Sequence, residues 1–214
     1  MSRCGRAGPC EEMFKPRMAR RSLERFRKKG LGKLERQMVE SAAAGDLDGA
    51  RVLEIGGGIG TLQAELLERG AAEGEVVELV SAWEPYAGEL ARERGLEERT
   101  SFRVVDVLDD PSAVEPADVV LLNRVVCCSP DGVVLAGRAA ALARRSLVLS
   151  FPRNALWVRA GLGLVNLVVR LGGGSFRVFV HPPAALATAI EAEGLRVAGG
   201  TRGLVWQFAA FTRA

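Results

Sequence analysis

The stretch Val52-Leu-Glu-Ile-Gly-Gly-Gly-Ile-Gly60 decides how the rest of the chain is interpreted. It begins with an apolar run that holds one acid, which is typical of a buried parallel strand. The glycines that follow form a turn where the backbone can come close to a ligand, because no Cβ is present. From Thr61 to Arg69 the leucines have helical spacing, so the turn opens a helix whose free N–H groups face the ligand. This order predicts the nucleotide-binding start of a doubly wound α/β sheet.

The spacing of the glycines excludes two phosphate-binding motifs. A dinucleotide motif needs a third glycine at the position of Thr61, and a P-loop needs a Lys followed by Ser or Thr, which is absent. What remains is Glu54 followed by glycines at 56, 58 and 60. A carboxylate at this position suits a ligand that carries an ammonium group and no phosphate.

This acid and its alternating glycines resemble motif I of class I S-adenosylmethionine-dependent methyltransferases. The resemblance implies a doubly wound, Rossmann-like sheet of seven strands whose last strand is antiparallel. It implies S-adenosylmethionine (SAM) as the cofactor and S-adenosylhomocysteine (SAH) as its product. The residues expected to hold the amino-acid end of the cofactor are Glu54, Gly56, Gly57, Gly58 and Gly60.

Two further predicted strands end in acids. Glu78 lies near the end of the strand over 74–79, at the distance from the glycine turn at which this fold places a carboxylate on ribose hydroxyls. Asp106 follows the strand over 100–105, and the resemblance implies that it accepts from the adenine amino group. The neighbours Leu79 and Val107 are included in the predicted cofactor site.

The fourth predicted strand, over 117–123, ends at Asn123 and Arg124. Ligands in such sheets lie beyond the carboxyl ends of the strands, so we expect these two residues to meet the methionine part of the cofactor. Cys128 follows closely and is a candidate catalytic and substrate residue, although a free cysteine is also a common small core residue.

The segment over 154–171 is almost wholly apolar, with Arg159 and Arg170 inside it. A membrane span needs about 20 apolar residues without such charges, so a span is rejected. Two interpretations stay open. The preferred one is a helix, within an insert over 153–180, that lines an apolar acceptor pocket. The other is peripheral contact with a membrane surface. The alternating pattern over 176–180 predicts a short strand.

His181 is the only histidine, and it precedes a predicted helix over 183–193. A helix N-terminus repels imidazolium, which would leave a neutral ring able to accept a proton. His181 is therefore the candidate general base; alternatively it only orients the start of the helix. Two strands, over 195–198 and 204–212, are predicted to close the fold as a hairpin.

The second half of the chain is similar to magnesium-protoporphyrin IX O-methyltransferases. The matching strings cover 125–131, 149–153, 177–181 and 202–208. The resemblance implies O-methyl transfer to a carboxylate of an amphipathic acceptor. Cys128 stands where these enzymes carry a histidine, and the tyrosine of their N-terminal cap is missing, since Tyr86 is the only tyrosine. The predicted substrate residues are Arg153, Trp157, Cys128, His181 and Trp206.

The N-terminal part of the chain is strongly basic. Residues 1–40 hold twelve Lys and Arg against five Glu, whereas the whole chain has a net charge of +3. We expect a flexible leader over 1–12, which includes Cys4 and Cys10, then a helical cap over 13–44 that Gly30 and Gly32 split in two. The cap either covers the sheet or forms a lid over the cofactor mouth, with the basic run from Arg25 to Lys29 near anionic groups of the substrate. The methyltransferase domain is expected over 45–214.

These features predict an enzyme that methylates a small amphipathic molecule, as a monomer or homodimer. The cysteines have no framework spacing, which favours a reducing cytoplasm, and no metal site is expected. One alternative is a cofactor-binding regulatory protein without turnover. Another is a nucleic-acid methyltransferase, against which the fourth strand ends in Asn-Arg-Val-Val instead of the signature of base amino methylation.

Overall fold

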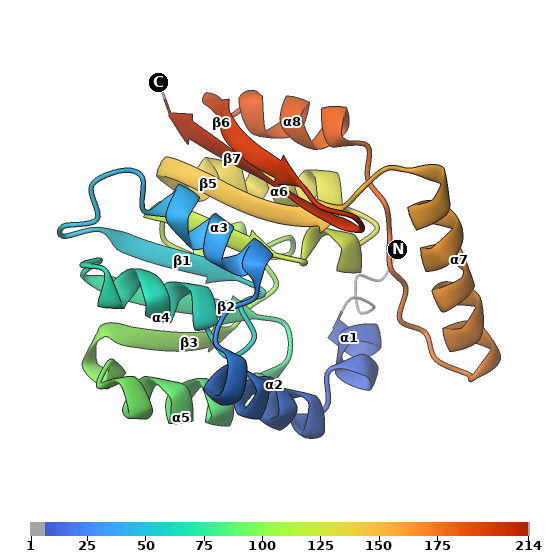
Figure 1. The fold of residues 1–214 in the computed structure, drawn as a ribbon, viewed down its shortest axis with the longest axis horizontal. Helices are drawn as coiled ribbons and strands as arrows, with labels where there is room; N and C mark the ends of the chain where they lie inside the picture. Colours follow the sequence, from blue (N-terminus) through green and yellow to red (C-terminus); the bar gives the residue numbers. More distant parts are fainter. Residues whose placement is uncertain (1–6, 214) are drawn as a thin grey trace.

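A seven-stranded sheet forms the centre of the computed structural model, which describes residues 7–213. The strand order is β3-β2-β1-β4-β5-β7-β6, and β7 runs antiparallel to both of its neighbours (Figure 1). The other neighbouring pairs are parallel. The strands are β1 (Arg51–Ile55), β2 (Glu73–Glu78), β3 (Thr100–Val104), β4 (Ala117–Asn123), β5 (Ala143–Pro152), β6 (Leu195–Arg202) and β7 (Trp206–Arg213). The predicted fold class is confirmed.

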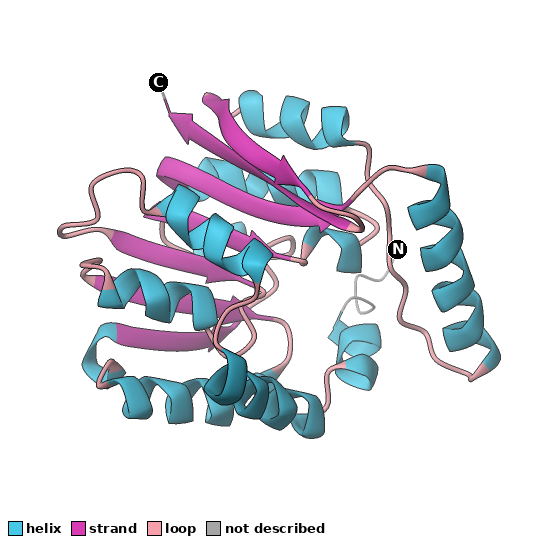
Figure 2. Ribbon diagram, viewed as in Figure 1, coloured by secondary structure: helices cyan, strands magenta, loops and turns pink. Residues whose placement is uncertain are grey.

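Helices cover both faces of this sheet and make a three-layer molecule (Figure 2). The helices are α1 (Ala7–Met13), α2 (Pro16–Lys29), α3 (Lys33–Ala42), α4 (Thr61–Glu68), α5 (Glu84–Arg94), α6 (Gly132–Leu142), α7 (Leu156–Leu171) and α8 (Pro183–Glu191). One apolar core joins the sheet to α2, α3, α4 and α5, and a second joins it to α6 and α8.

The two cores explain why the central strands are uniformly apolar. In β4, Val119 and Leu121 belong to one core, while Val120 and Leu122 belong to the other. Side chains alternate across a strand, so a strand covered on both faces needs apolar residues at every position. Replacing the fully buried Leu121 by Ala would cost about 2–5 kcal/mol. The carboxyl ends of β1 to β4 consequently meet at one edge, where the predicted site residues follow them.

The N-terminal segment differs from the prediction at its start. Helix α1 occupies Ala7–Met13, where a flexible leader is expected, and Cys10 in this helix is buried. Residues 1–6, with Cys4, lie outside the described residues. The cap divides at Gly30–Gly32 as predicted. Helix α3 packs on β5 and β7, while α2 packs on α5.

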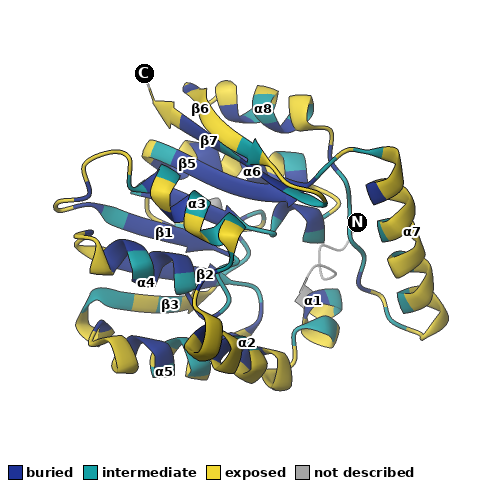
Figure 3. Ribbon diagram, viewed as in Figure 1, coloured by how far each residue is buried: buried dark blue, intermediate teal, exposed yellow. Residues whose placement is uncertain are grey.

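The segment after β5 differs more from its predicted structure. Residues 176–180 form no strand, because Val178 is hydrogen-bonded to the Asn166 amide of α7 and Phe179 N–H donates to Cys127 O at 2.7 Å. Helix α7 forms as predicted but is mostly exposed (Figure 3). Among residues 7–213, no helix combines the length and the apolar character that crossing a bilayer requires.

Candidate functional site

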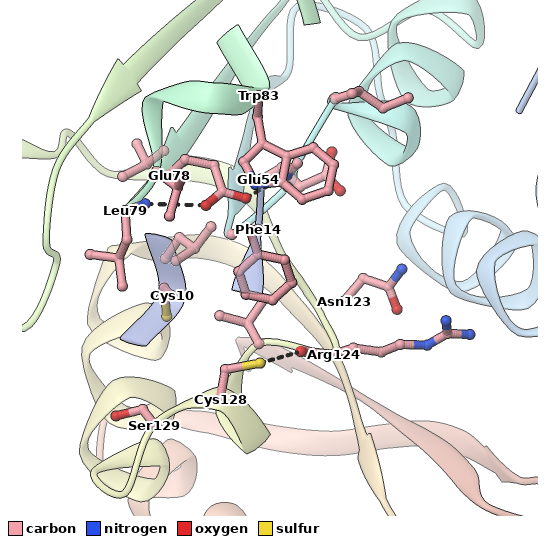
Figure 4. Close-up of a pocket in the computed structure, with 18 of the residues that line it drawn as sticks. Cys10, Phe14, Glu54, Glu78, Leu79, Trp83, Asn123, Arg124, Cys128 and Ser129 are labelled. Carbon is pink, nitrogen blue, oxygen red and sulfur yellow. Dashed lines mark hydrogen bonds between the residues drawn. The ribbon is translucent and has the colours of Figure 1, made fainter. Parts of the chain in front are cut away.

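A cavity of about 580 Å³ lies at the carboxyl edge of β1, β2 and β4 (Figure 4). Its wall has three sources: the strand ends, the N-terminal cap, and the segment over 175–179. The predicted site residues that line it are Glu54, Gly56, Gly57, Gly58, Glu78, Leu79, Asp106, Val107, Asn123, Arg124 and Cys128. Strand ends far apart in the sequence thus share one cavity, as the switch-point rule requires.

The glycine turn after β1 leaves no room for larger residues. Gly56 and Gly58 have φ values of 64° and 60°, a region that L side chains avoid. A Cβ on Gly56 would lie 2.6 Å from a methyl carbon of Val125. A Cβ on Gly57 would lie 2.7 Å from Cγ of Glu54. The bare backbone of this turn therefore reaches the cavity directly.

Glu54 is 1% exposed and anchors the turn to the next helix. Its Oε2 accepts from Gln63 N–H at 3.1 Å, in the first turn of α4. Burial raises the pKa of this carboxyl to about 8, and the nearby charge of Glu78 adds to the rise, while backbone N–H donors of Gln63 and Leu62 oppose it. A nearby cation stabilises the ionised form of a buried carboxyl whose pKa is raised, so this carboxyl suits an ammonium ligand.

Glu78 points into the cavity from the end of β2 (Figure 4). Its Oε1 accepts from Gly58 N–H at 2.7 Å, and its Oε2 accepts from Leu79 N–H at 3.1 Å. Burial raises its pKa to about 7, although both hydrogen bonds favour the ionised form. Each oxygen keeps a second lone pair, so the carboxylate can accept from two neighbouring hydroxyls while it holds the glycine turn.

Asp106 lies in the turn that follows β3, and its Oδ1 accepts from Leu108 N–H at 2.9 Å. Both Asp106 and the buried Val107 line the cavity. The carboxylate is thus held at the cavity wall by its own turn, where it can accept from a further donor.

Arg124 takes an unusual conformation at the end of β4, with φ of 62°. Its N–H donates to Ser150 Oγ at 2.9 Å, and that hydroxyl donates to Asn123 Oδ1 at 2.7 Å. Its guanidinium pairs with Glu35 of α3 at 2.9 Å and lies over the ring of Trp206, 5.1 Å from the centroid. These contacts offset a backbone strain of about 1–3 kcal/mol and tie the cap to the cavity.

Cys128 lines the cavity, and its thiol donates to Arg124 O at 3.4 Å. The interaction with the Cys127 thiol, followed by burial, raises the pKa of Cys128 well above its usual range. The thiol therefore stays protonated near neutral pH, and the structure gives it no catalytic chemistry. Within residues 7–213, no three His, Cys, Asp or Glu side chains are grouped so as to hold a metal ion.

His181 is placed away from the cavity lining, which corrects its prediction as a base. Its Nε2 lies 3.0 Å from the carbonyl oxygens of both Val126 and Ser129. Two acceptors require that Nε2 carries the proton, so this nitrogen is occupied as a donor. The ring is 8% exposed and closes the start of α6. This geometry matches the alternative in which His181 orients a local turn.

Four other predicted residues also lie outside the lining. Trp157 is half-exposed on α7, and Arg153 donates to Gly203 O at 3.3 Å. Trp206 lies under the Arg124 guanidinium, which itself lines the cavity. Gly60, with φ of 75°, begins α4 instead of facing the cavity. The interpretation of α7 as a pocket wall is wrong, because no residue of α7 lines this cavity.

Several lining residues are not predicted from the sequence. Cys10, Phe14, Phe176 and Arg177 line the cavity without having been predicted, whereas Arg25 lines it as the lid interpretation of the cap expects. The Phe14 ring centroid lies 5.9 Å from that of Trp83 and 5.6 Å from that of Phe176. The apolar spacing that begins at Phe14 is a signal that the cap is buried, but it does not show against what. The lid interpretation of the cap gains support from these contacts.

No family model and no curated protein matches the chain. Solved structures match its fold. The magnesium protoporphyrin IX methyltransferase ChlM from Synechocystis PCC 6803, with bound SAH, is 22% identical with a TM-score of 0.66, over 84% of this chain and 83% of that one. The same enzyme with bound SAM is 20% identical with a TM-score of 0.64, over 85% and 78%.

Two proteins of O-methyltransferase families also match. One, from Burkholderia thailandensis, is 21% identical with a TM-score of 0.69 over 94% of this chain. The other, from Planctomyces limnophilus DSM 3776 in complex with apigenin, is 16% identical with a TM-score of 0.68 over 95% of this chain. The chain spans 63% of the length of each. With the strand order described above, these likenesses show that the chain has the Rossmann-like fold of SAM-dependent methyltransferases.

Proposed function

We propose that this chain binds SAM in the cavity and transfers its methyl group to a small amphipathic acceptor. The observation that carries the proposal is the convergence of the glycine turn, Glu78, Asp106 and the Asn123–Arg124 corner on one cavity. The proteins of this fold with bound SAM or SAH make that cofactor the natural occupant.

The residues that line the cavity fit SAM, which carries no phosphate and so needs no phosphate-binding group. Glu54 and the bare turn would hold the ammonium and carboxylate of the amino-acid end, Glu78 the two ribose hydroxyls, and Asp106 the adenine amino group. SAM supplies an electrophilic methyl group on a sulfonium. The task of this chain is to bind, to orient and to exclude water, which together lower the barrier for an in-line transfer.

The wall supplied by the cap and the segment over 175–179 favours an amphipathic anion as acceptor. Phe14, Phe176 and Phe179 make this wall aromatic, while Arg25 and Arg177 add positive charge. Cys128 stays protonated and His181 does not line the cavity, so neither supplies a base there. A carboxylate acceptor needs none, because its oxygen already carries the attacking lone pair. O-methylation of a carboxylate is therefore the reaction that we propose.

Calorimetric titration with SAH tests the cofactor site. Wild type should bind SAH, and Glu78→Ala should bind it at least about tenfold more weakly, because hydrogen bonds to a charged group contribute about 1.5–3 kcal/mol. Glu73→Ala is the matched control, since Glu73 lies at the opposite, exposed end of the same strand. Failure of wild type to bind SAH, or equal affinity of Glu78→Ala, would contradict the proposal.

A transfer assay separates an enzyme from a protein that only binds the cofactor. Isotope-labelled SAM, mixed with the protein and a set of aromatic carboxylic acids, should give base-labile methyl esters. SAH binding without any labelled product from such acceptors or from an extract would support the regulatory alternative instead.

A further inference from the structure

Helix α7 turns an apolar face to solvent. The exposed fractions along this face are 83% for Leu156, 50% for Trp157, 62% for Leu164, 49% for Leu167, 61% for Val168 and 79% for Leu171. Spacings of three and four residues place these side chains on one side of the helix. Figure 3 shows α7 as a mostly exposed helix, whereas the strands at the centre of the sheet are mostly buried. An apolar surface of this size is typical of an interaction site.

The orientation of α7 is fixed by its inner side. Val158 is buried, and the Asn166 amide makes two hydrogen bonds of 2.8 Å, donating to Val178 O and accepting from Val178 N–H. Within the described chain, α7 has no extensive packing against another helix or strand, and it stands apart from the sheet in Figure 1. The buried Val158 and the two bonds of the half-buried Asn166 amide keep this side of the helix inward, so the apolar face stays outside.

The charged residues of α7 and its own connections, over 153–180, have one sign, although Glu12 of α1 accepts from Ser175 N–H at 3.0 Å just beyond the helix. The sequence contains no Asp or Glu between Asp131 and Glu191, but it contains seven arginines there. Two of them, Arg159 and Arg170, are exposed on α7 itself. They are three turns of about 3.6 residues apart and therefore flank the apolar face on the same edge. An apolar face with a cationic edge is complementary to a surface that is apolar inside and anionic outside.

We propose that the outer face of α7 binds the surface of a bilayer that contains anionic phospholipid. The helix lies in the plane of the interface, with its leucines among the acyl chains and its arginines at the phosphates. Trp157, at the N-terminal end of the helix, takes the position that tryptophan favours at membrane interfaces.

A second copy of the chain fits this face less well. Antiparallel pairing of two α7 helices through their apolar faces would gather Arg159 and Arg170 of both copies along one edge. The 153–180 segment offers no carboxylate to neutralise them. The proposal does not depend on the methyltransferase activity, so its failure would leave the cavity assignment intact.

Vesicle flotation tests the proposal with the full chain. Vesicles of equal parts phosphatidylcholine and phosphatidylglycerol should carry the protein upward, and vesicles of phosphatidylcholine alone should carry much less. Raising the salt concentration should weaken the binding, because exposed charges are screened. Absence of binding to the anionic vesicles at low salt would overturn the proposal.

Matched substitutions locate the contact. Leu164→Glu should weaken vesicle binding at least about tenfold, because an acid at this position opposes both the apolar and the anionic part of the interface. Val197→Glu is the control: Val197 is 58% exposed on β6 and should leave vesicle binding unchanged. Arg159→Gln should weaken binding about fivefold. Equal effects of the two glutamate variants would contradict the assignment to α7.

Two further measurements distinguish binding of a membrane from binding of a second copy of the chain. SAH affinity and the circular dichroism spectrum should be unchanged in Leu164→Glu, since its side chain touches neither the cavity nor a core. Sedimentation velocity without lipid should give the same species for wild type and Leu164→Glu. A wild-type dimer that Leu164→Glu dissociates, with no vesicle binding by wild type, would assign the face to a second copy instead.

Discussion

The strand ends around the glycine turn and the segment over 153–182 are both predicted to carry site residues, yet the predicted residues of the two regions differ in whether they line the cavity. In the first region, Glu54, Glu78 and Asp106 all line the cavity. In the second, Arg153, Trp157 and His181 do not. The first region is held by hydrogen-bonded strands whose ends must meet. The second has no sheet partner, and its position depends on side-chain contacts that sequence spacing does not reveal.

The difference shows which sequence signals predict where a residue lies in the fold. An acid at the end of a buried strand is placed by the register of the whole sheet, as for Glu78, which is fixed where β2 pairs with β1 and β3. A polar residue in a connection has no such constraint. Chemical suitability, as for His181, indicates what a residue could do but gives no information on where it lies.

Substitution of one glycine in each region is expected to give the largest difference in stability between them. Gly56→Ala should lower the free energy of unfolding by more than about 2 kcal/mol, because φ is positive and Val125 occupies the space of the new methyl group. Gly161→Ala in α7 should raise it by up to about 1 kcal/mol, since nothing lies within 4 Å and alanine favours the helix. Urea unfolding measures both. Equal effects of the two substitutions would remove the contrast.

A pH series isolates the buried carboxyls of the first region. The pKa values of Glu54 and Glu78 are raised to about 8 and about 7, so the folded chain holds more protons than the unfolded one between about pH 4.5 and 8. The free energy of unfolding should therefore fall as the pH rises through this window, by up to about 1.4 kcal/mol per pH unit for each carboxyl. The segment over 153–180 holds no carboxyl to add to this slope.

The control for the pH series is Glu54→Gln, which should flatten the profile. Affinity for SAH should change in the opposite direction and increase with pH, because the ligand favours the ionised carboxylates. A wild-type profile without slope between pH 5 and 8 would show that these carboxyls are not held in a dry environment.

The substitution His181→Ala tests whether His181 has a structural role and no role in the cavity. Removal of the ring takes one donor from each of the carbonyls of Val126 and Ser129, which keep backbone donors at 3.5 and 3.2 Å, and should cost about 0.5–1.5 kcal/mol of unfolding free energy. SAH affinity should be unchanged, because the ring does not line the cavity. Calorimetry and thermal unfolding on the same sample check both parts. A loss of SAH affinity with full stability would return His181 to the site.

The smallest effect is expected for Trp157→Ala. Its side chain is half-exposed on the outer face of α7, so the free energy of unfolding should change by no more than about 0.5 kcal/mol and SAH affinity not at all. The same variant should bind anionic vesicles less tightly. Weaker SAH binding by this variant would mean that α7 does reach the cavity.

The sequence predicts most of the fold because both faces of the sheet are covered. The strands are therefore apolar throughout, whereas the helices are apolar on one side, and the two patterns can be told apart. It fails at α1, because residues 1–12 are rich in Gly and Arg as in a leader, while Cys10 is buried only by tertiary contacts. It also fails at 176–180, where an alternating pattern has no strand edge to pair with and bonds to Asn166 instead. The cavity wall from the cap lies beyond sequence reasoning for the same reason: Phe14 is apolar, but its partners come from distant elements.

The crystal structure of the chain grown with SAH tests the central claim most directly. The account predicts the adenosine between Glu78 and Asp106, with both ribose hydroxyls within hydrogen-bond distance of Glu78 and the amino-acid end on the turn over 56–58. An adenosine located elsewhere, or a phosphate-bearing ligand resting on the glycine turn, would contradict it.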